Sequence, residues 1–122
     1  MLILDGGIGS EMDIRLGHLQ NDDPTWCAAH HISHPELLRH VYDDFVRSGS
    51  QILSANTYSI LQYLLKTSDS EIEASVSKAV QILQTVREAH PKIIIAGCVS
   101  AHSCDEYTAD EIDKSIRLLA TC

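Results

Sequence analysis

The amino-acid sequence predicts an α/β fold built on a parallel sheet. Short apolar runs recur along the 122-residue chain at residues 2–4, 51–56 and 92–99. The second and third runs are continuously apolar, which is typical of strands that are buried on both faces. Patterns of helical period lie between and after the runs, so the predicted order is a strand followed by a helix, three times over. Strands that alternate with helices imply right-handed crossovers and a parallel sheet.

The first helix is predicted at residues 35–48, after the first strand and a linker. Pro35 suits the first position of a helix, and Gly49 suits the residue just past its end. The apolar side chains of this segment repeat at helical spacing, so they share one face: Leu37, Leu38, Val41 and Phe45. The second strand follows this helix directly.

The second helix begins at a predicted capping box, Ser70-x-x-Glu73, in which the two side chains satisfy main-chain N–H groups at the helix start. It is predicted to stop near His90, because Pro91 disfavours helical geometry in the residue before it. The third strand comes next.

The third helix is predicted from a capping box at Thr108-x-x-Glu111, and its apolar stripe runs on without a stop signal. The strands recur roughly every 42–48 residues, counted from Leu4 to Ile52 to Ile94. Eight such units would need about 320 residues, within the range of (β/α)8 barrels. The sequence therefore predicts the first three βα units of a (β/α)8 TIM barrel, a barrel that is incomplete in this chain and truncated in the third helix.

Composition and charge exclude several classes of protein. The chain carries 17 acidic and 9 basic residues, a formal net charge of −8, without the Lys/Arg clusters that nucleic-acid binding needs. No segment approaches the roughly 18–20 apolar residues of a membrane span, and no secretory signal is visible. We therefore expect a cytoplasmic protein that binds neither nucleic acid nor membranes. Its four cysteines are interpreted as reduced thiols: Cys27, Cys98, Cys104 and Cys122.

A glycine-rich segment, residues 5–10, follows the first predicted strand, at the end of a parallel sheet where ligands bind. Its glycines, Gly6, Gly7 and Gly9, let main-chain N–H groups approach and bind a carboxylate or phosphate. Asp5 stands where it could accept a hydrogen bond from a ligand ammonium. Together these features suit the zwitterionic end of an α-amino acid. The alternative, a tight turn capped by Asp5, is equally compatible with the pattern.

A second polar cluster follows the second strand. Asn56, Thr57 and Tyr58 offer an amide, a hydroxyl and a phenol that could hydrogen bond a substrate. The same groups could instead satisfy the neighbouring main chain, and by themselves they favour that simpler interpretation.

Two groups of cysteine and histidine residues are candidates for metal ligands. One group is Cys27, His30, His31 and His34, and the other is Cys98, His102 and Cys104. Neither has the spacing of a standard zinc site, and a single cysteine in a strand is more often a small buried apolar residue. Metal binding by either group is disfavoured.

Several stretches of the sequence together resemble the homocysteine S-methyltransferase family. They are ILDGGIGSEM, Asp23-Pro24-x-Trp26, HPELLRHVYDDFVRSGSQILSANTY and IAGCVSAHSCDEYTADEI. The likeness covers essentially the whole chain, so residues 1–122 are expected to form a partial homocysteine-binding barrel domain. It implies transfer of a methyl group from a small donor to the homocysteine thiolate, giving methionine.

The resemblance also implies roles for individual residues. Carried over by position, Asp5 and Gly6 would bind the amino-acid end of homocysteine, and Gly7 would help to form the loop. Thr57 and Tyr58 would line the substrate pocket. In the family a zinc ion binds the homocysteine thiol as a thiolate, which makes the sulfur a nucleophile at neutral pH.

The sequence departs from the family in its zinc ligands. The resemblance implies three cysteines, two of them adjacent in a Gly-Gly-Cys-Cys motif, and this sequence contains no such motif. Zinc is therefore expected for the complete family domain, and no metal ligand or catalytic residue is assigned to this chain. We expect the chain alone to be inactive.

The main alternative is a non-catalytic product, either a truncated one or a small α/β interaction module. A partial sheet exposes an edge and apolar surface, so such a chain would self-associate through the open sheet edge. A flavodoxin-like nucleotide-binding domain is a weaker third alternative.

Overall fold

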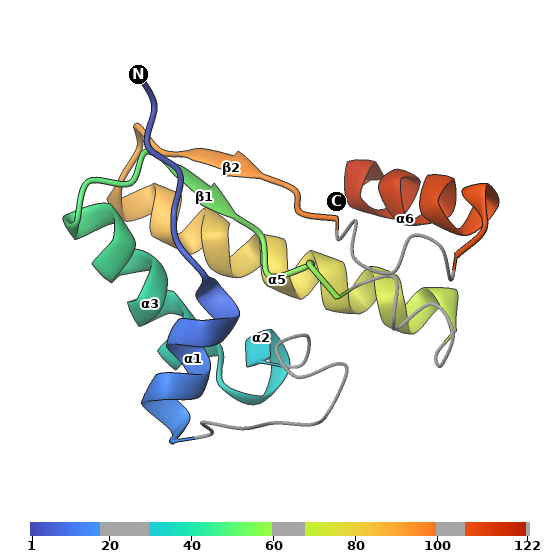
Figure 1. Ribbon diagram of the computed structural model, residues 1–122, viewed down its shortest axis with the longest axis horizontal. Helices are drawn as coiled ribbons and strands as arrows, with labels where there is room; N and C mark the ends of the chain where they lie inside the picture. Colours follow the sequence, from blue (N-terminus) through green and yellow to red (C-terminus); the bar gives the residue numbers. More distant parts are fainter. Residues whose placement is uncertain (18–29, 60–67, 100–106, 122) are drawn as a thin grey trace.

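The computed structural model describes residues 1–17, 30–59, 68–99 and 107–121 of the chain. Its helices and strands are shown in Figure 1. In chain order they are α1 (Ile8–Leu16), α2 (His30–Ser33), α3 (Pro35–Arg47), β1 (Ile52–Ser54), α5 (Asp69–Ala89), β2 (Ile94–Ala96) and α6 (Ala109–Thr121). None of the helices in these ranges is long and apolar enough to cross a membrane.

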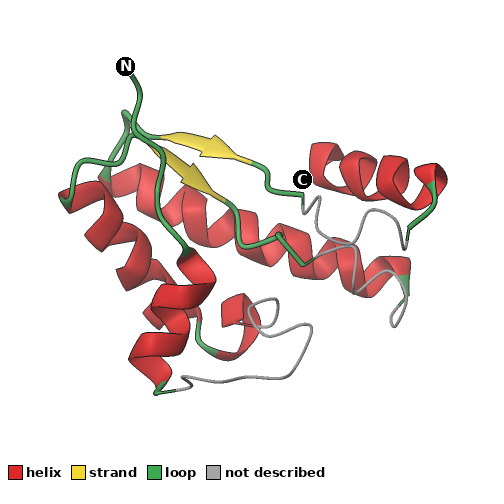
Figure 2. Ribbon diagram, in the orientation of Figure 1, coloured by secondary structure: helices red, strands yellow, loops and turns green. Residues whose placement is uncertain are grey.

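The sheet is parallel, as the sequence predicts. β1 pairs with β2 in a register that places Ile52 opposite Ile94. On the other side of β1, the N-terminal segment is tied by a parallel bridge between Leu4 and Ile52 and by a 2.8 Å hydrogen bond from the Gln51 N–H to the Ile3 carbonyl. The strand expected at residues 2–4 is therefore only an extended segment with a single bridge, drawn as a loop in Figure 2. Among the described residues it pairs only with β1, and α1 begins four residues after Leu4.

β1 lies in the middle of this arrangement, between the N-terminal segment and β2. In a flavodoxin-like domain the first strand would be the central one, between the second and third. The observed order is consecutive instead, as in a barrel, and it contradicts the flavodoxin-like alternative.

The core lies on one face of the sheet, which α3 and α5 cover (Figure 1). Leu53 of β1 is fully buried there against Tyr42 and other side chains of these two helices. The expectation that both faces of the strands are buried is wrong for the described residues. Leu4 and Ile94 on the opposite face are 56% and 47% exposed, because successive side chains of a strand point to opposite faces and α3 and α5 cover only one.

The predicted ends of α3 agree with the structure. The helix begins at Pro35 and ends at Arg47, and Gly49 follows with a φ angle of 106° that favours glycine. α5 likewise ends at Ala89, just before His90 and Pro91.

The start of α5 differs from the prediction by two residues. The capping box is formed by Ser68 and Glu71, whereas the sequence favoured Ser70 and Glu73. The Glu71 carboxylate accepts hydrogen bonds from the Ser68 N–H at 2.9 Å and from the Ser68 hydroxyl at 2.7 Å. The sequence repeats Ser-x-x-Glu two residues apart, and the earlier pair gives the longer helix.

The capping box predicted for the last helix is confirmed. The Glu111 carboxylate accepts hydrogen bonds from the Thr108 N–H at 2.7 Å and from the Thr108 hydroxyl at 2.8 Å. α6 then runs from Ala109 to Thr121 and contacts α5.

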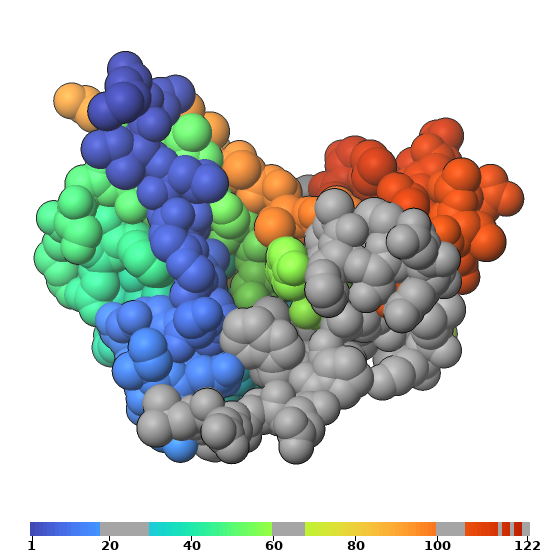
Figure 3. All heavy atoms as spheres, in the orientation of Figure 1, coloured from blue at the N-terminus to red at the C-terminus, as the bar shows by residue number. Residues whose placement is uncertain are grey.

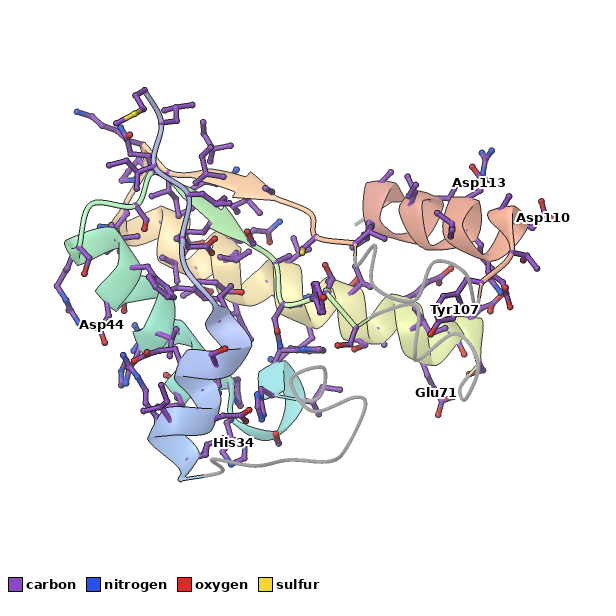
Figure 4. The ribbon with its side chains drawn as sticks, in the orientation of Figure 1. His34, Asp44, Glu71, Tyr107, Asp110 and Asp113 are labelled. Carbon is purple, nitrogen blue, oxygen red and sulfur yellow. The ribbon has the colours of Figure 1, made fainter. Side chains whose placement is uncertain are left out.

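Two helices were not predicted, α1 and the four-residue α2. The glycines that precede α1 suggested a loop, although Ile8 and Met12 are four residues apart, as on one face of a helix, and both are buried. Arg15 ties α1 to α3 through a 2.8 Å ion pair with Asp44, which projects from α3 in Figure 4.

Candidate functional site

A pocket of about 300 Å³ lies at the carboxyl ends of the N-terminal segment, β1 and β2. In parallel α/β folds this is the end of the sheet where ligands bind. The N-terminal segment and α1, blue in Figure 3, lie on the surface of the view shown. The pocket is lined by Gly6, Gly7, Ile8, Gly9, Ser10, Ser54, Ala55, Asn56, Tyr58 and Cys98.

The start of α1 forms one wall of the pocket. Gly7 is the residue that precedes the helix, and it has no side chain to cap it. The first hydrogen bond within the helix runs from the Glu11 N–H to the Gly7 carbonyl at 3.0 Å. The N–H groups of the first turn have no acceptor within the helix, and they carry the positive end of its dipole. This wall therefore suits the negative charge of a carboxylate or phosphate.

Gly6 has a packing role that the sequence did not reveal. A Cβ atom at this position would lie 2.8 Å from the ring of Phe45 on α3. Contacts between carbon atoms settle at about 3.5–4.0 Å, so any side chain here would push the ring away. The glycine thus allows the N-terminal segment to lie close to α3 while it also lines the pocket.

Asp5 lies next to Gly6 and Ser54 of the pocket lining, and its carboxylate joins the N-terminal segment to β1. One carboxylate oxygen accepts a 2.7 Å hydrogen bond from the Ser54 N–H, and the other accepts a 2.9 Å bond from the Ser54 hydroxyl. Burial raises the pKa of Asp5, and the two bonds from Ser54 oppose that shift. Each carboxylate oxygen retains a second lone pair that a ligand ammonium could use.

Thr57 bonds Cys98 of the pocket lining and so joins the end of β1 to the end of β2. It is 5% exposed, and its hydroxyl donates a 2.7 Å hydrogen bond to the Cys98 carbonyl and accepts one from the Cys98 N–H at 3.3 Å. Tyr58 is 43% exposed and lines the pocket. Of the predicted residues, Gly6, Gly7 and Tyr58 therefore line the pocket, and Asp5 and Thr57 support its wall.

Tyr42 supports the pocket from the core, a role that no sequence pattern singled out. This side chain is fully buried on α3, and its hydroxyl donates a 2.9 Å hydrogen bond to the carbonyl of Ser54. Burial, followed by the nearby charge of Asp5, raises the pKa of Tyr42 above its usual range, so the hydroxyl stays protonated. Tyr42 follows Leu38 by four residues, so the helical spacing that places Leu38 and Val41 on the buried face could have placed Tyr42 there too.

The described residues do not fit a zinc ion. A zinc site needs at least three protein ligands, and no three His, Cys, Asp or Glu side chains of the described ranges are grouped to hold a metal. Cys98 is partly exposed and lines the pocket. Cys27, His102 and Cys104, which belonged to the candidate ligand groups, lie outside the described residues.

A second cavity, of about 450 Å³, lies at the opposite end of the strands. It is lined by residues of the turns that enter β1 and β2, among them Ser50, Gln51 and Lys92. The amino ends of barrel strands serve stability and not catalysis. The smaller pocket at the carboxyl ends is therefore the candidate functional site.

Comparison with known proteins gives consistent matches. A family model described as homocysteine S-methyltransferase matches residues 2–117. The chain is 29% identical to homocysteine S-methyltransferase 3 of Zea mays, over 89% of this chain and 38% of that protein. It is 28% identical to homocysteine S-methyltransferase of Escherichia coli K12, over 90% and 37% of the two chains. It is 30% identical to selenocysteine methyltransferase of Astragalus bisulcatus, over 93% and 31%.

A solved structure has the same fold. The metallated form of the homocysteine methyltransferase MmuM from Escherichia coli matches with a TM-score of 0.78 and 22% sequence identity. The match covers 99% of this chain and 50% of that one. The parallel sheet and its helices thus correspond to part of an α/β barrel, and the chain spans less than half the length of the curated relatives it matches.

Proposed function

The chain belongs to the homocysteine S-methyltransferase family, and from this premise we propose that its pocket holds the amino-acid end of homocysteine during methyl transfer. Residues 1–122 would form the first three βα units of a homocysteine-binding barrel domain. The reaction of the whole domain would convert homocysteine to methionine with a small methyl donor.

One observation carries this proposal: the first turn of α1 and the carboxylate of Asp5 lie at the same end of the sheet. The N–H groups at Gly7 and Ile8 would bind the α-carboxylate of the substrate. Asp5 would attract the α-ammonium group, since its oxygens have lone pairs beyond those that bond Ser54. Tyr58 would contact the substrate at the pocket wall, and Thr57 would keep that wall in place.

The chemistry of the step is a displacement at the methyl carbon. The homocysteine thiol gives its proton to solvent, the thiolate sulfur bonds the methyl carbon, and the donor leaves with the electron pair of its bond to the methyl group. The pocket residues named above would bind and orient the substrate for this step. Because the described residues do not fit a zinc ion, no part of the step is assigned to zinc, and we expect no turnover by the 122-residue chain alone.

Calorimetric titration of the chain with L-homocysteine under reducing conditions tests the proposal. We expect binding, weakened about 10- to 100-fold in Asp5→Asn, because hydrogen bonds to a charged group contribute about 1.5–3 kcal/mol. Asp113→Asn is the matched control, since Asp113 lies on α6 and pairs with Arg117 (Figure 4). Failure of the unaltered chain to bind homocysteine, or equal affinity in both variants, would contradict the proposal.

A second candidate function is that of a non-catalytic module that self-associates. The exposed side chains of Leu4 and Ile94 favour it, because they form an apolar surface on the face of the sheet opposite α3 and α5. They lie near the edge of β2 that pairs with no other strand of the described ranges. Sedimentation velocity should then show oligomers that Ile94→Lys dissociates. Ile116→Lys on α6, where the side chain is 51% exposed, should leave them intact. A monomer at all concentrations would contradict this candidate.

A further inference from the structure

A buried chain of polar side chains runs from the pocket wall into the helices. Asn56, which lines the pocket, is 4% exposed, and its side-chain nitrogen lies 3.4 Å from Nδ1 of His31. The other ring nitrogen of His31, Nε2, lies 2.7 Å from the hydroxyl oxygen of Ser75 on α5. His31 itself is 2% exposed on the short helix α2, which packs against α3 and α5.

The protons in this chain can be assigned from chemistry. Burial, together with the neighbouring His30 and Lys78, lowers the pKa of His31 to about 4, so the ring is neutral near pH 7. A neutral imidazole has one donor nitrogen and one acceptor nitrogen. The Asn56 amide N–H donates to Nδ1, so the Nε2–H donates to Ser75. This assignment fixes the tautomer of the ring and the direction of the planar amide.

We propose that His31 is a positioning residue that fixes the side-chain amide of Asn56 in the pocket wall, and that Asn56 is a further residue in contact with the amino-acid end of the substrate. Ser75 acts one step further back, by holding the tautomer of His31. The identity of the ligand rests on the function proposed above, whereas the positioning of Asn56 by His31 does not.

The cost of burying His31 supports a role beyond packing. Placing an imidazole at 2% exposure removes it from water, and an apolar side chain of similar size would avoid that loss. Both of its ring nitrogens are engaged, one toward the pocket and one toward α5. Asn56 is itself buried, and its contact with His31 orients the side-chain amide.

Nuclear magnetic resonance of the 122-residue chain without ligand tests the positioning. We expect the nitrogen shifts of His31 to report the Nε2–H tautomer and the Asn56 side-chain N–H₂ signals to be resolved. His31→Leu should move those amide signals, and Ser75→Ala should shift the tautomer balance of His31. His34→Leu, at a neighbouring exposed histidine, is the control. Asn56 signals that are unchanged in His31→Leu would overturn the proposal.

Binding of L-homocysteine supplies the second test. Asn56→Ala, His31→Leu and Ser75→Ala should each weaken affinity about three- to tenfold, the range expected for one lost hydrogen bond. His31→Gln, which keeps a polar group at this position, should retain more affinity than His31→Leu, and it replaces that variant if the leucine chain does not fold. Urea unfolding curves identify the variants that fold.

The two proposals fail in different ways. If the unaltered chain binds homocysteine and all three variants bind it equally well, the substrate contact of Asn56 is overturned while the proposed function stands. If the unaltered chain does not bind homocysteine, the proposed function and the substrate contact of Asn56 are both overturned. The resonance experiment then still decides whether His31 positions Asn56.

Discussion

The two faces of the small parallel sheet differ in how far the chain covers them. On one face Leu53 is fully buried beneath α3 and α5, whereas on the other Leu4 and Ile94 are about half exposed. Both faces are equally apolar in sequence, which is the pattern of strands inside a barrel. The difference shows that the described helices supply a core for one face only. The apolar residues on the other face have the character of a barrel interior.

The largest expected effect is a difference in the free energy of unfolding between substitutions on the two faces. Leu53→Ala should lower the free energy of unfolding by about 2–5 kcal/mol, because it leaves a cavity in the covered core. Leu4→Ala, the same change at a side chain that is 56% exposed, should cost less than about 1 kcal/mol. Urea denaturation followed by circular dichroism measures both. Equal losses would mean that another surface covers Leu4 and would contradict the difference between the two faces.

The next effect is a dependence of stability on pH, through the buried side chain of His31. The pKa of His31 is about 4 in the folded chain and 6.5 as a model value, so the unfolded state binds the proton first as the pH falls. Stability is full above about pH 6.5 and should decline toward pH 4 by an amount on the order of 2 kcal/mol. Urea unfolding at several pH values measures this slope. His31→Asn should flatten it, and an unchanged slope in this variant would contradict the assignment to His31.

A smaller effect compares a buried phenol with an exposed one. Tyr42→Phe removes the hydroxyl that bonds the Ser54 carbonyl, and it should cost about 1–2 kcal/mol in thermal or urea unfolding. Tyr58→Phe changes a side chain that is 43% exposed at the pocket, so its effect should stay within about 0.5 kcal/mol. If Tyr58→Phe were the more destabilising of the two, the assignment of Tyr42 as the support of the pocket would be wrong.

The smallest effect compares two glycines near the pocket. Gly6→Ala brings a methyl group to 2.8 Å from the Phe45 ring, and we expect a loss of about 1 kcal/mol as the ring shifts. Gly97→Ala meets nothing within 4 Å and should be neutral or slightly stabilising, because alanine restricts the unfolded chain. Thermal unfolding of the pair measures the difference. A neutral Gly6→Ala would show that Phe45 does not pack closely there.

Much of the fold could be predicted from local chemistry. Pro35 and Gly49 mark the bounds of α3, and Thr108 with Glu111 marks the start of α6, because these signals act within one helical turn. The start of α5 was misplaced because two Ser-x-x-Glu pairs overlap and only packing decides between them. α1 was missed because its glycines weaken the helical pattern, and its stability comes from Ile8 and Met12 packed in the core.

The candidate site was predictable only in part. The glycines and polar residues after the strands predict a site at this end of the sheet, and Gly6, Gly7 and Tyr58 line the pocket there. Bonding of Thr57 to main chain agrees with the simpler interpretation of its cluster, but the partners of Asp5 and Thr57 were not visible, because Ser54 and Cys98 lie 49 and 41 residues away in sequence. Contacts over such separations are set by the register of the sheet, which no local pattern reports.

The most direct test of the account compares homocysteine with two analogues that each lack one charged group. Calorimetry of the 122-residue chain should detect binding of L-homocysteine. 4-Mercaptobutanoic acid, which lacks the amino group, and 3-mercaptopropylamine, which lacks the carboxylate, should each bind at least about tenfold more weakly. That result would assign the pocket to the amino-acid end of the substrate. Equal affinity for all three compounds, or binding of none, would contradict the central claim.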